Sequence, residues 1–143
     1  MKVIEVTQYS DSVLEAINGL LPQLSKSAVP LSKVDLIAII QSEASHLLMA
    51  EHDGQFCGSL TLAVFKIPTG TRAWIEDVVV NEDARGKGVG RLLSEHALGL
   101  ATQRGAKTVD LTSRPSREAA KALYKKLGFE LRETNVYRWR KSR

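Results

Sequence analysis

The stretch Arg85-Gly86-Lys87-Gly88-Val89-Gly90 decides how this chain is interpreted, because it joins a strand pattern to a helix pattern. Ile75-Glu76-Asp77-Val78-Val79-Val80 precedes it and is typical of a strand, and an amphipathic helix pattern begins at Val89. The three glycines let the backbone turn tightly and bring its N–H groups close to a ligand. A helix N-terminus adds unpaired N–H groups and the positive end of the helix dipole, and Arg85, Lys87 and Arg91 add positive charge. The stretch therefore predicts a site for a phosphate or pyrophosphate group.

Composition limits the class of protein. The chain has 143 residues, which suits a single domain over residues 1–143. A net charge of +4 fits a polyanionic ligand but is too small to indicate nucleic acid. The single cysteine, Cys57, rules out an intrachain disulfide, and we interpret it as buried filler in a strand. With no apolar run long enough for a membrane span and no signal-peptide pattern, we expect a soluble, cytoplasmic protein.

Hydrophobic periodicity and turn residues predict a mixed fold of alternating helices and strands. We expect strands at residues 2–7, 46–51, 55–67, 72–80, 107–112, 129–132 and 136–139, and helices at residues 13–24, 32–44, 89–104 and 116–127. Ser32 and Ser116 are the expected caps of two of these helices. This order predicts an α+β (mixed α/β) fold with helices on both faces of one sheet.

Two motifs resemble one protein family. The glycine stretch resembles the acetyl-coenzyme-A pyrophosphate motif of the GNAT superfamily of N-acetyltransferases, in which Arg or Gln is followed by two residues, Gly, any residue, and Gly or Ala; here Arg85, Gly88 and Gly90 match it. Residues 120–130 are similar to the family's later helix and its Gly-Phe exit, and the element order fits over the whole chain. The resemblance implies a GNAT-like acyl-CoA N-acyltransferase fold, with a central, mostly antiparallel sheet, a splayed central strand pair and helices on both faces.

The resemblance also implies the activity and the binding residues. It implies transfer of an acetyl group from acetyl-CoA to a primary amine of a small molecule or peptide, without a metal. Many members have an Asn where this chain has Arg117, so a contact to the cosubstrate would pass to Ser116 or to Arg117 itself. The expected cosubstrate-binding residues are Val78, Val80, Arg85, Gly86, Lys87, Gly88, Val89, Gly90, Arg91, Ser116 and Arg117.

Acetyl transfer needs a base and an acid. An amine with a pKa of about 10.4 is neutral in only about one part in 2,500 at pH 7, so a base must remove its proton. Glu76 is the candidate base, on a strand face shared with Val78 and Val80; the alternative is a strand carboxylate paired with Arg72 or with a neighbouring chain. Asp77 points to the opposite face by the same alternation, and we interpret it as structural.

Two side chains on helices need separate interpretations. By resemblance Tyr124 is the candidate acid that protonates the leaving sulfur; the alternative is a core aromatic residue on an amphipathic helix. His96 lies on the apolar side of the helix pattern after the glycines, and we interpret it as a buried core histidine rather than a catalyst.

The acceptor is not encoded in these motifs. Residues 75–88 are similar to glucosamine-6-phosphate N-acetyltransferases, but the same pattern occurs in GNAT proteins generally. The expected partner is an amine-bearing acceptor, with no nucleic acid and no membrane, and a homodimer is left open. The alternative function is an acyl-CoA-binding or regulatory module with vestigial catalytic groups. A Walker loop and a dinucleotide fingerprint are disfavoured, because the glycine spacing Gly86-x-Gly88-x-Gly90 fits neither.

Overall fold

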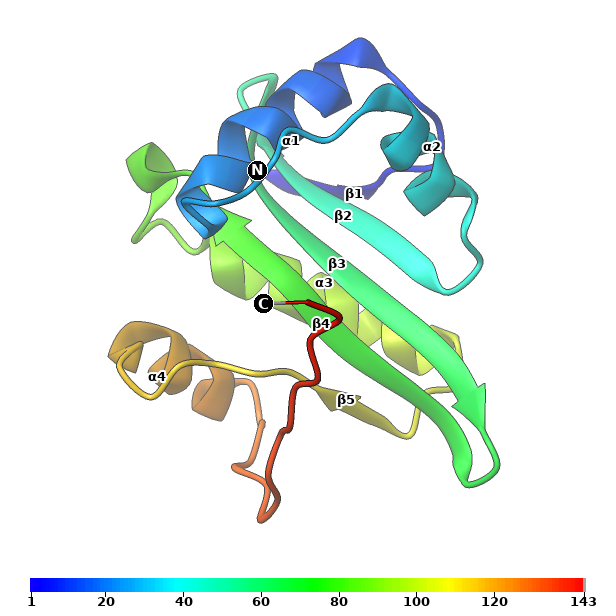
Figure 1. Ribbon diagram of the computed structural model, residues 1–143. Helices are drawn as coiled ribbons and strands as arrows, with labels where there is room; N and C mark the ends of the chain where they lie inside the picture. The colour runs from blue at the N-terminus through cyan, green and yellow to red at the C-terminus, as the bar shows by residue number, and fades with distance from the viewer. Residues whose placement is uncertain (143) are drawn as a thin grey trace. The chain divides into compact units, whose positions relative to one another are not determined.

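The computed structural model describes residues 1–142 of the chain. They divide into two compact units, Met1–Thr112 and Ser113–Arg143. The first unit contains one sheet and three α-helices, and the second contains one α-helix and the C-terminal segment (Figure 1). A single domain over residues 1–143 stays a prediction. The elements are β1 (Lys2–Glu5), α1 (Asp11–Leu24), α2 (Lys33–Gln41), β2 (Ser45–His52), β3 (Gln55–Ile67), β4 (Gly70–Val80), the 3-10 turn η1 (Glu82–Ala84), α3 (Val89–Gln103), β5 (Thr108–Asp110) and α4 (Glu118–Lys126).

The sheet of the first unit has five strands in the order β1-β2-β3-β4-β5. Its first four strands pair in antiparallel fashion as consecutive neighbours, and β5 joins β4 in parallel after the crossover through α3. The tight turn at Asp53 and Gly54, both at positive φ, connects β2 to β3 as the sequence predicts. The fold is therefore the expected mixed α+β architecture with an open, mostly antiparallel sheet.

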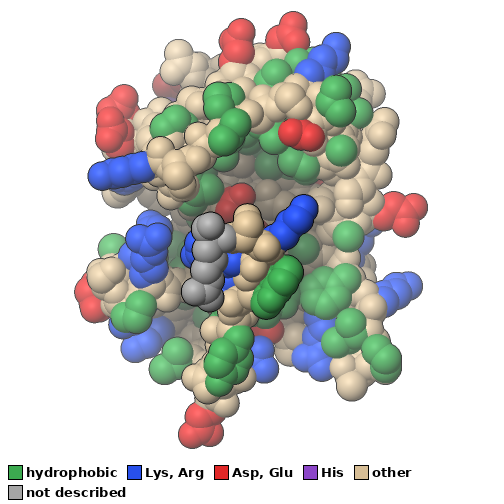
Figure 2. Space-filling model, in the orientation of Figure 1, with side chains coloured by type: hydrophobic (Ala, Val, Ile, Leu, Met, Phe, Trp, Pro, Cys, Tyr) green, Lys and Arg blue, Asp and Glu red, His purple; other side chains and the backbone are tan. Residues whose placement is uncertain are grey.

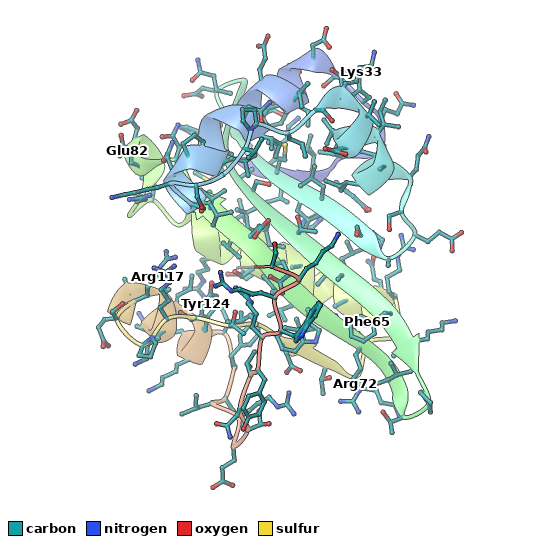
Figure 3. The ribbon with its side chains drawn as sticks, in the orientation of Figure 1. Lys33, Phe65, Arg72, Glu82, Arg117 and Tyr124 are labelled. Atoms are coloured by element: carbon teal, nitrogen blue, oxygen red, sulfur yellow. The ribbon has the colours of Figure 1, made fainter. Side chains whose placement is uncertain are left out.

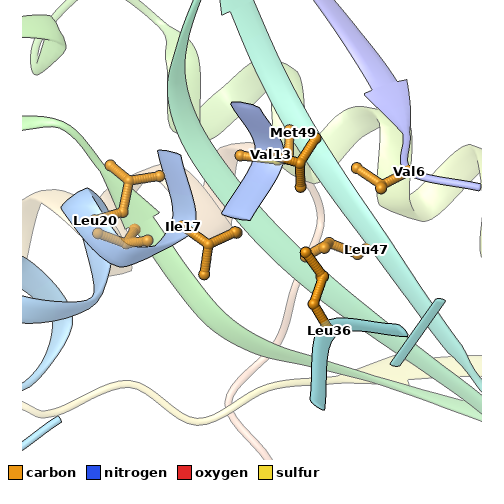
Figure 4. Close-up of a cluster of buried hydrophobic side chains, with 8 residues drawn as sticks. Val6, Val13, Ile17, Leu20, Leu36, Leu47 and Met49 are labelled. Atoms are coloured by element: carbon orange, nitrogen blue, oxygen red, sulfur yellow. The ribbon is translucent and has the colours of Figure 1, made fainter. Parts of the chain in front are cut away.

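Helices α1 and α2 cover one face of the sheet (Figure 1). Each begins at a serine whose hydroxyl accepts a backbone N–H bond, Ser10 from Val13 at 3.2 Å and Ser32 from Asp35 at 3.1 Å, so the expected cap at Ser32 is confirmed. Figure 4 shows the core that these helices form with the strands. Its buried members are Val6, Val13, Ile17, Leu20, Leu36, Leu47, Met49 and Val79.

Helix α3 covers the opposite face, and Gly58 of β3 allows it to lie close. A Cβ atom at Gly58 would lie 2.9 Å from Val89 Cγ1 and 3.2 Å from Leu93 Cδ1. The small residue Ser94 is fully buried on the same helix, and its hydroxyl donates to the Gly90 carbonyl at 2.7 Å. Small residues at the contact thus place the N-terminus of α3 directly against β3.

Strand β4 is irregular on both of its sides. Thr61 of β3 lies opposite Glu76, and Ser59 lies opposite Val79, so Asp77 and Val78 together oppose the single residue Leu60. This is a β-bulge, and Asp77 has a φ of 51° within it. On its other side β4 pairs with β5 only through residues 72–74, although it continues to residue 80. Strand β4 therefore continues past the end of β5, and residues 75–80 have no described strand partner on that side.

The second unit differs from the sequence prediction in two respects. Residues 129–142 contain no strand, so the strands expected at 129–132 and 136–139 are wrong. A strand needs a partner for its backbone groups, and no strand that pairs with this segment is described within residues 1–142. Its hydrophobic side chains Leu131, Val136, Tyr137 and Trp139 are exposed. Figure 2 shows that hydrophobic side chains reach the surface on the face in view. Helix α4 begins after Arg117 with no side-chain cap, so the expected cap at Ser116 is also wrong.

The contact at Gly58 gives a stability prediction. Gly58→Ala should lower the free energy of unfolding by about 1–3 kcal/mol, because the added methyl group would overlap Val89 and approach the Val79 carbonyl at 3.2 Å. The matched control is Gly99→Ala in α3, where the added Cβ meets nothing within 4 Å. This substitution should raise the free energy of unfolding by roughly 0.5–1 kcal/mol. Urea denaturation of both variants measures the difference; equal midpoints would show that α3 does not need the small residue.

Candidate functional site

The loop between η1 and α3 has the conformation that its glycines predict. Gly86 and Gly88 have φ angles of 77° and 83°, which side chains with a Cβ rarely adopt. Gly88 is the N-cap of α3, and no side chain of residues 1–142 caps that helix end. The first α3 backbone bond runs from Leu92 N–H to the Gly88 carbonyl at 3.0 Å. The N–H groups of residues 89–91 therefore have no partner within the helix.

Three cationic side chains surround this helix end. Arg85, Lys87 and Arg91 are all exposed, and the first turn of α3 contains no acidic residue within the described chain. Arg85 Nε donates to the Val80 carbonyl at 3.3 Å, which ties the loop to the end of β4. Arg91 already forms an ion pair within α3, since its Nε donates to Glu95 Oε1 at 2.7 Å. Backbone donors and two unpaired cations, Arg85 and Lys87, form a donor set that suits a diphosphate.

The free edge of β4 leads directly into this loop. Beyond the short pairing with β5, no described strand bonds to residues 75–80 on that side. The backbone N–H and C=O groups of that edge can accept an extended ligand in the manner of an added strand. Val78 and Val80, two of the expected cosubstrate-binding residues, belong to this segment, and both are half-buried.

The bulge in β4 changes which side chains share a face. Glu76 lies opposite Thr61 and Val79 opposite Ser59, so both face α1 and α2. Val80 lies opposite Gly58 and faces α3. The prediction that Glu76 shares a face with Val78 and Val80 is therefore wrong, because one extra residue shifts the alternation. The prediction that Asp77 points to the face opposite Glu76 is also wrong. Asp77 lines a pocket with Thr61 and Val79 on the α1 side of the sheet.

The carboxylate of Glu76 is exposed at the surface of β4. Among residues 1–142 no hydrogen bond or ion pair involves its exposed carboxylate. The alternative partner, Arg72, donates instead to Thr69 Oγ1 at 3.1 Å and Thr108 Oγ1 at 3.4 Å. Figure 3 shows Arg72 near the hairpin end of β4, where it lies opposite Phe65 in register. The carboxylate of Glu76 is thus available to a ligand.

Tyr124 belongs to α4 of the second unit. Its ring packs edge-on against Phe129, with 5.6 Å between ring centroids, and burial raises the pKa of its phenol although nearby Arg117 lowers it. The phenol is therefore protonated at neutral pH, as a proton donor must be. Figure 3 labels Tyr124 and Arg117 on this unit. Ser116 and Arg117, the other expected binding residues, precede α4.

The sequence predicted His96 and Cys57 to be buried residues, but Cys57 is only partly buried. His96 is exposed, contrary to prediction, because the buried face of α3 is centred on Leu93 and Ala97. Burial raises the pKa of the Cys57 thiol, which argues against a nucleophile.

Within the described residues, no group of three or more His, Cys, Asp or Glu side chains could hold a metal ion. No helix in the described part of the chain has the length and apolar character to span a membrane.

Asp77 is the site residue that the sequence analysis missed. Strand alternation placed it on the wrong face, and a bulge leaves little sign in sequence. One signal was present: Asp is among the few residues that tolerate positive φ, and Asp77 follows Glu76 in a strand whose flanking residues, Ile75 and Val78, are hydrophobic and β-branched.

Comparisons with known proteins agree with this geometry. The sequence model of the Acetyltransferase (GNAT) family matches residues 14–129. A curated relative named "Uncharacterized N-acetyltransferase YhfO", from Bacillus subtilis (strain 168), is 34% identical over 97 residues, which are 66% of this chain and 65% of that protein. The match thus spans slightly less than two thirds of that relative.

Solved structures share the fold. A protein of Agrobacterium tumefaciens str. C58 that is described as an acetyltransferase has a TM-score of 0.87 at 22% identity, over 98% of this chain and 100% of that one. Glucosamine-6-phosphate N-acetyltransferase from Arabidopsis thaliana has a TM-score of 0.81 at 18% identity, over 97% and 99%. At such low identity these likenesses show the fold alone. The family match, however, covers most of the sequence, from α1 through α4, and on that ground this chain belongs to the acetyltransferase (GNAT) family.

Proposed function

We propose that this chain transfers the acetyl group of acetyl-CoA to a primary amine. One observation carries the proposal: a single strand–loop–helix segment of the first unit combines the unpaired carboxylate of Glu76, the free edge of β4 and the uncapped N-terminus of α3. The proposed base, the strand edge for an extended ligand and the anion site therefore all lie within residues 76–91.

The anion site fits the diphosphate of coenzyme A. Its donors are the N–H groups of residues 89–91, and Arg85 and Lys87 add charge beside them. A Cβ atom at Gly86 or Gly88 would meet no protein atom within 4 Å, so the space over the loop is open to a ligand. The side chains and backbone of the loop would hold the diphosphate, and the edge of β4 would hold the amide-bearing arm beyond it.

The protein's task in the reaction is proton transfer at two atoms. Acetyl-CoA supplies the acetyl group as a thioester, and coenzyme A leaves as a thiol. Glu76 accepts a proton from the amine nitrogen, directly or through a water, so that the neutral amine can attack. Tyr124 donates its phenolic proton to the departing sulfur as the C–S bond breaks, and the second proton that the acylated nitrogen loses restores the phenol. The family match, which includes both residues, supports these roles.

The loop gives the first functional prediction. Gly88→Ala should weaken coenzyme A binding at least tenfold, because the added Cβ strains a φ of 83° and projects toward the space that the diphosphate needs. Gly99→Ala, on the same helix and in open space, is the control and should bind as wild type does. Calorimetric titration measures both; unchanged affinity in Gly88→Ala would move the diphosphate site elsewhere.

The base gives a prediction about pH. Glu76→Gln should lower kcat by roughly 10²–10⁴-fold near neutral pH and recover in part as pH rises, because the amine then loses its proton unaided. Glu43→Gln removes an equally exposed carboxylate outside the sheet and should leave the profile unchanged. A Glu76→Gln enzyme slowed by the same factor at every pH would indicate a positioning role instead.

The acid gives a prediction that separates rate from affinity. Tyr124→Phe keeps the edge-on contact with Phe129 and deletes only the hydroxyl, so kcat should fall much more than coenzyme A affinity. Tyr137→Phe alters an exposed tyrosine of the same unit and serves as the control. If Tyr124→Phe retains full kcat, Tyr124 is a packing residue only.

A further inference from the structure

A pocket of about 100 Å³ opens beside the bulge of β4, on the α1 side of the sheet. Most of its lining is apolar and includes Leu20, Leu24, Leu31 and Val79. The wall that carries Leu31 is fixed to α1 by two hydrogen bonds, because Asn18 Nδ2 donates to the Leu31 carbonyl at 3.0 Å and Leu31 N–H donates to Asn18 Oδ1 at 2.7 Å. The pocket is therefore a preformed apolar space within the first unit.

Among residues 1–142, the polar side chains that line this pocket are Ser59, Thr61 and Asp77. Asp77 has a φ of 51°, an uncommon conformation for any residue with a Cβ, and the pairs on either side of the bulge hold it there. No hydrogen bond or ion pair within residues 1–142 involves its carboxylate. The bulge thus presents one unpaired negative charge to an apolar pocket, and a cationic group of a ligand would complement it.

Glu76 faces the same side of the sheet as this pocket. It lies opposite Thr61, which is a lining residue, and it precedes Asp77 in the chain. A cation held by Asp77 would therefore lie beside the carboxylate that the proposed function assigns as the base.

We propose, building on the proposed function, that this pocket binds the apolar body of the acceptor and that Asp77 binds its ammonium group, so that the acceptor is a small alkylamine. An amino sugar fits less well, because its several hydroxyl groups would lose their hydrogen bonds to water against an apolar lining. A polyamine fits less well because its second charge would find no further carboxylate in the lining.

The test compares amines and variants by steady-state acetylation. With 3-methylbutylamine, Asp77→Asn should raise KM by roughly 10- to 100-fold and change kcat far less, because a hydrogen bond to a charged group is lost from binding. Asn also tolerates positive φ, so the bulge should persist. Asp53→Asn is the matched control, since Asp53 has the same φ of 51° but lies in the exposed β2–β3 turn. It should leave KM unchanged.

A second variant tests the pocket itself. Leu31→Trp should fill it and raise KM for 3-methylbutylamine much more than for methylamine. A higher kcat/KM for glucosamine or spermidine than for 3-methylbutylamine would overturn this inference while leaving the proposed function intact, and so would an unchanged KM in Asp77→Asn. Calorimetry with 3-methylbutylamine alone separates the two proposals. Binding that Asp77→Asn weakens would support the subsite even if no amine were acetylated, and acetylation would then fail as the function.

Discussion

The unequal pairing of β4 is the constraint on which the rest of the site depends. On one side the strand pairs with β3 along nearly its whole length, and on the other it pairs with β5 only through residues 72–74. The hydrogen bonds to β3 hold β4 in place along its length. The strand can therefore have one unpaired edge and still be well ordered. Gly58 belongs to the same arrangement, because it lets the N-terminus of α3 lie against β3 where β4 ends. A rigid strand with one open edge thus leads straight into an anion-binding helix end.

Acidic side chains precede basic ones along this segment, and Glu82 and Asp83 of η1 lie between Asp77 and Arg85. Glu76 and Asp77 lie next to each other at the bulge, with no protein cation paired to either within the described residues. Arg85 and Lys87 follow within eleven residues, beside the positive end of the α3 dipole. A cationic amine and an anionic cosubstrate are therefore attracted to different ends of one element. This order of charges supports the proposed acetyl transfer to an amine more than the pocket volume does.

The sequence predicted well what depends on local spacing. The glycines at positions 86 and 88 have the positive φ angles that their pattern indicated, and the capping serine at position 32 forms its expected bond. It failed where a long-range contact decides. The bulge at Asp77 arises from register with β3, and periodicity within one strand cannot reveal an extra residue. The exposure of His96 depends on which side of α3 packs against the sheet, and the small residues at that contact decide this. Residues 129–142 have a composition typical of strands, but no partner strand for them is described.

Amide hydrogen exchange with and without coenzyme A follows the backbone groups that bind the cosubstrate in the proposed function. Peptides covering residues 75–91 should gain protection on addition of coenzyme A, since both the free edge of β4 and the first N–H groups of α3 acquire partners. Peptides covering β1 and β2, which lie at the other edge of the sheet, should not change. Unchanged exchange in residues 75–91, with protection gained elsewhere, would contradict the proposed cosubstrate site.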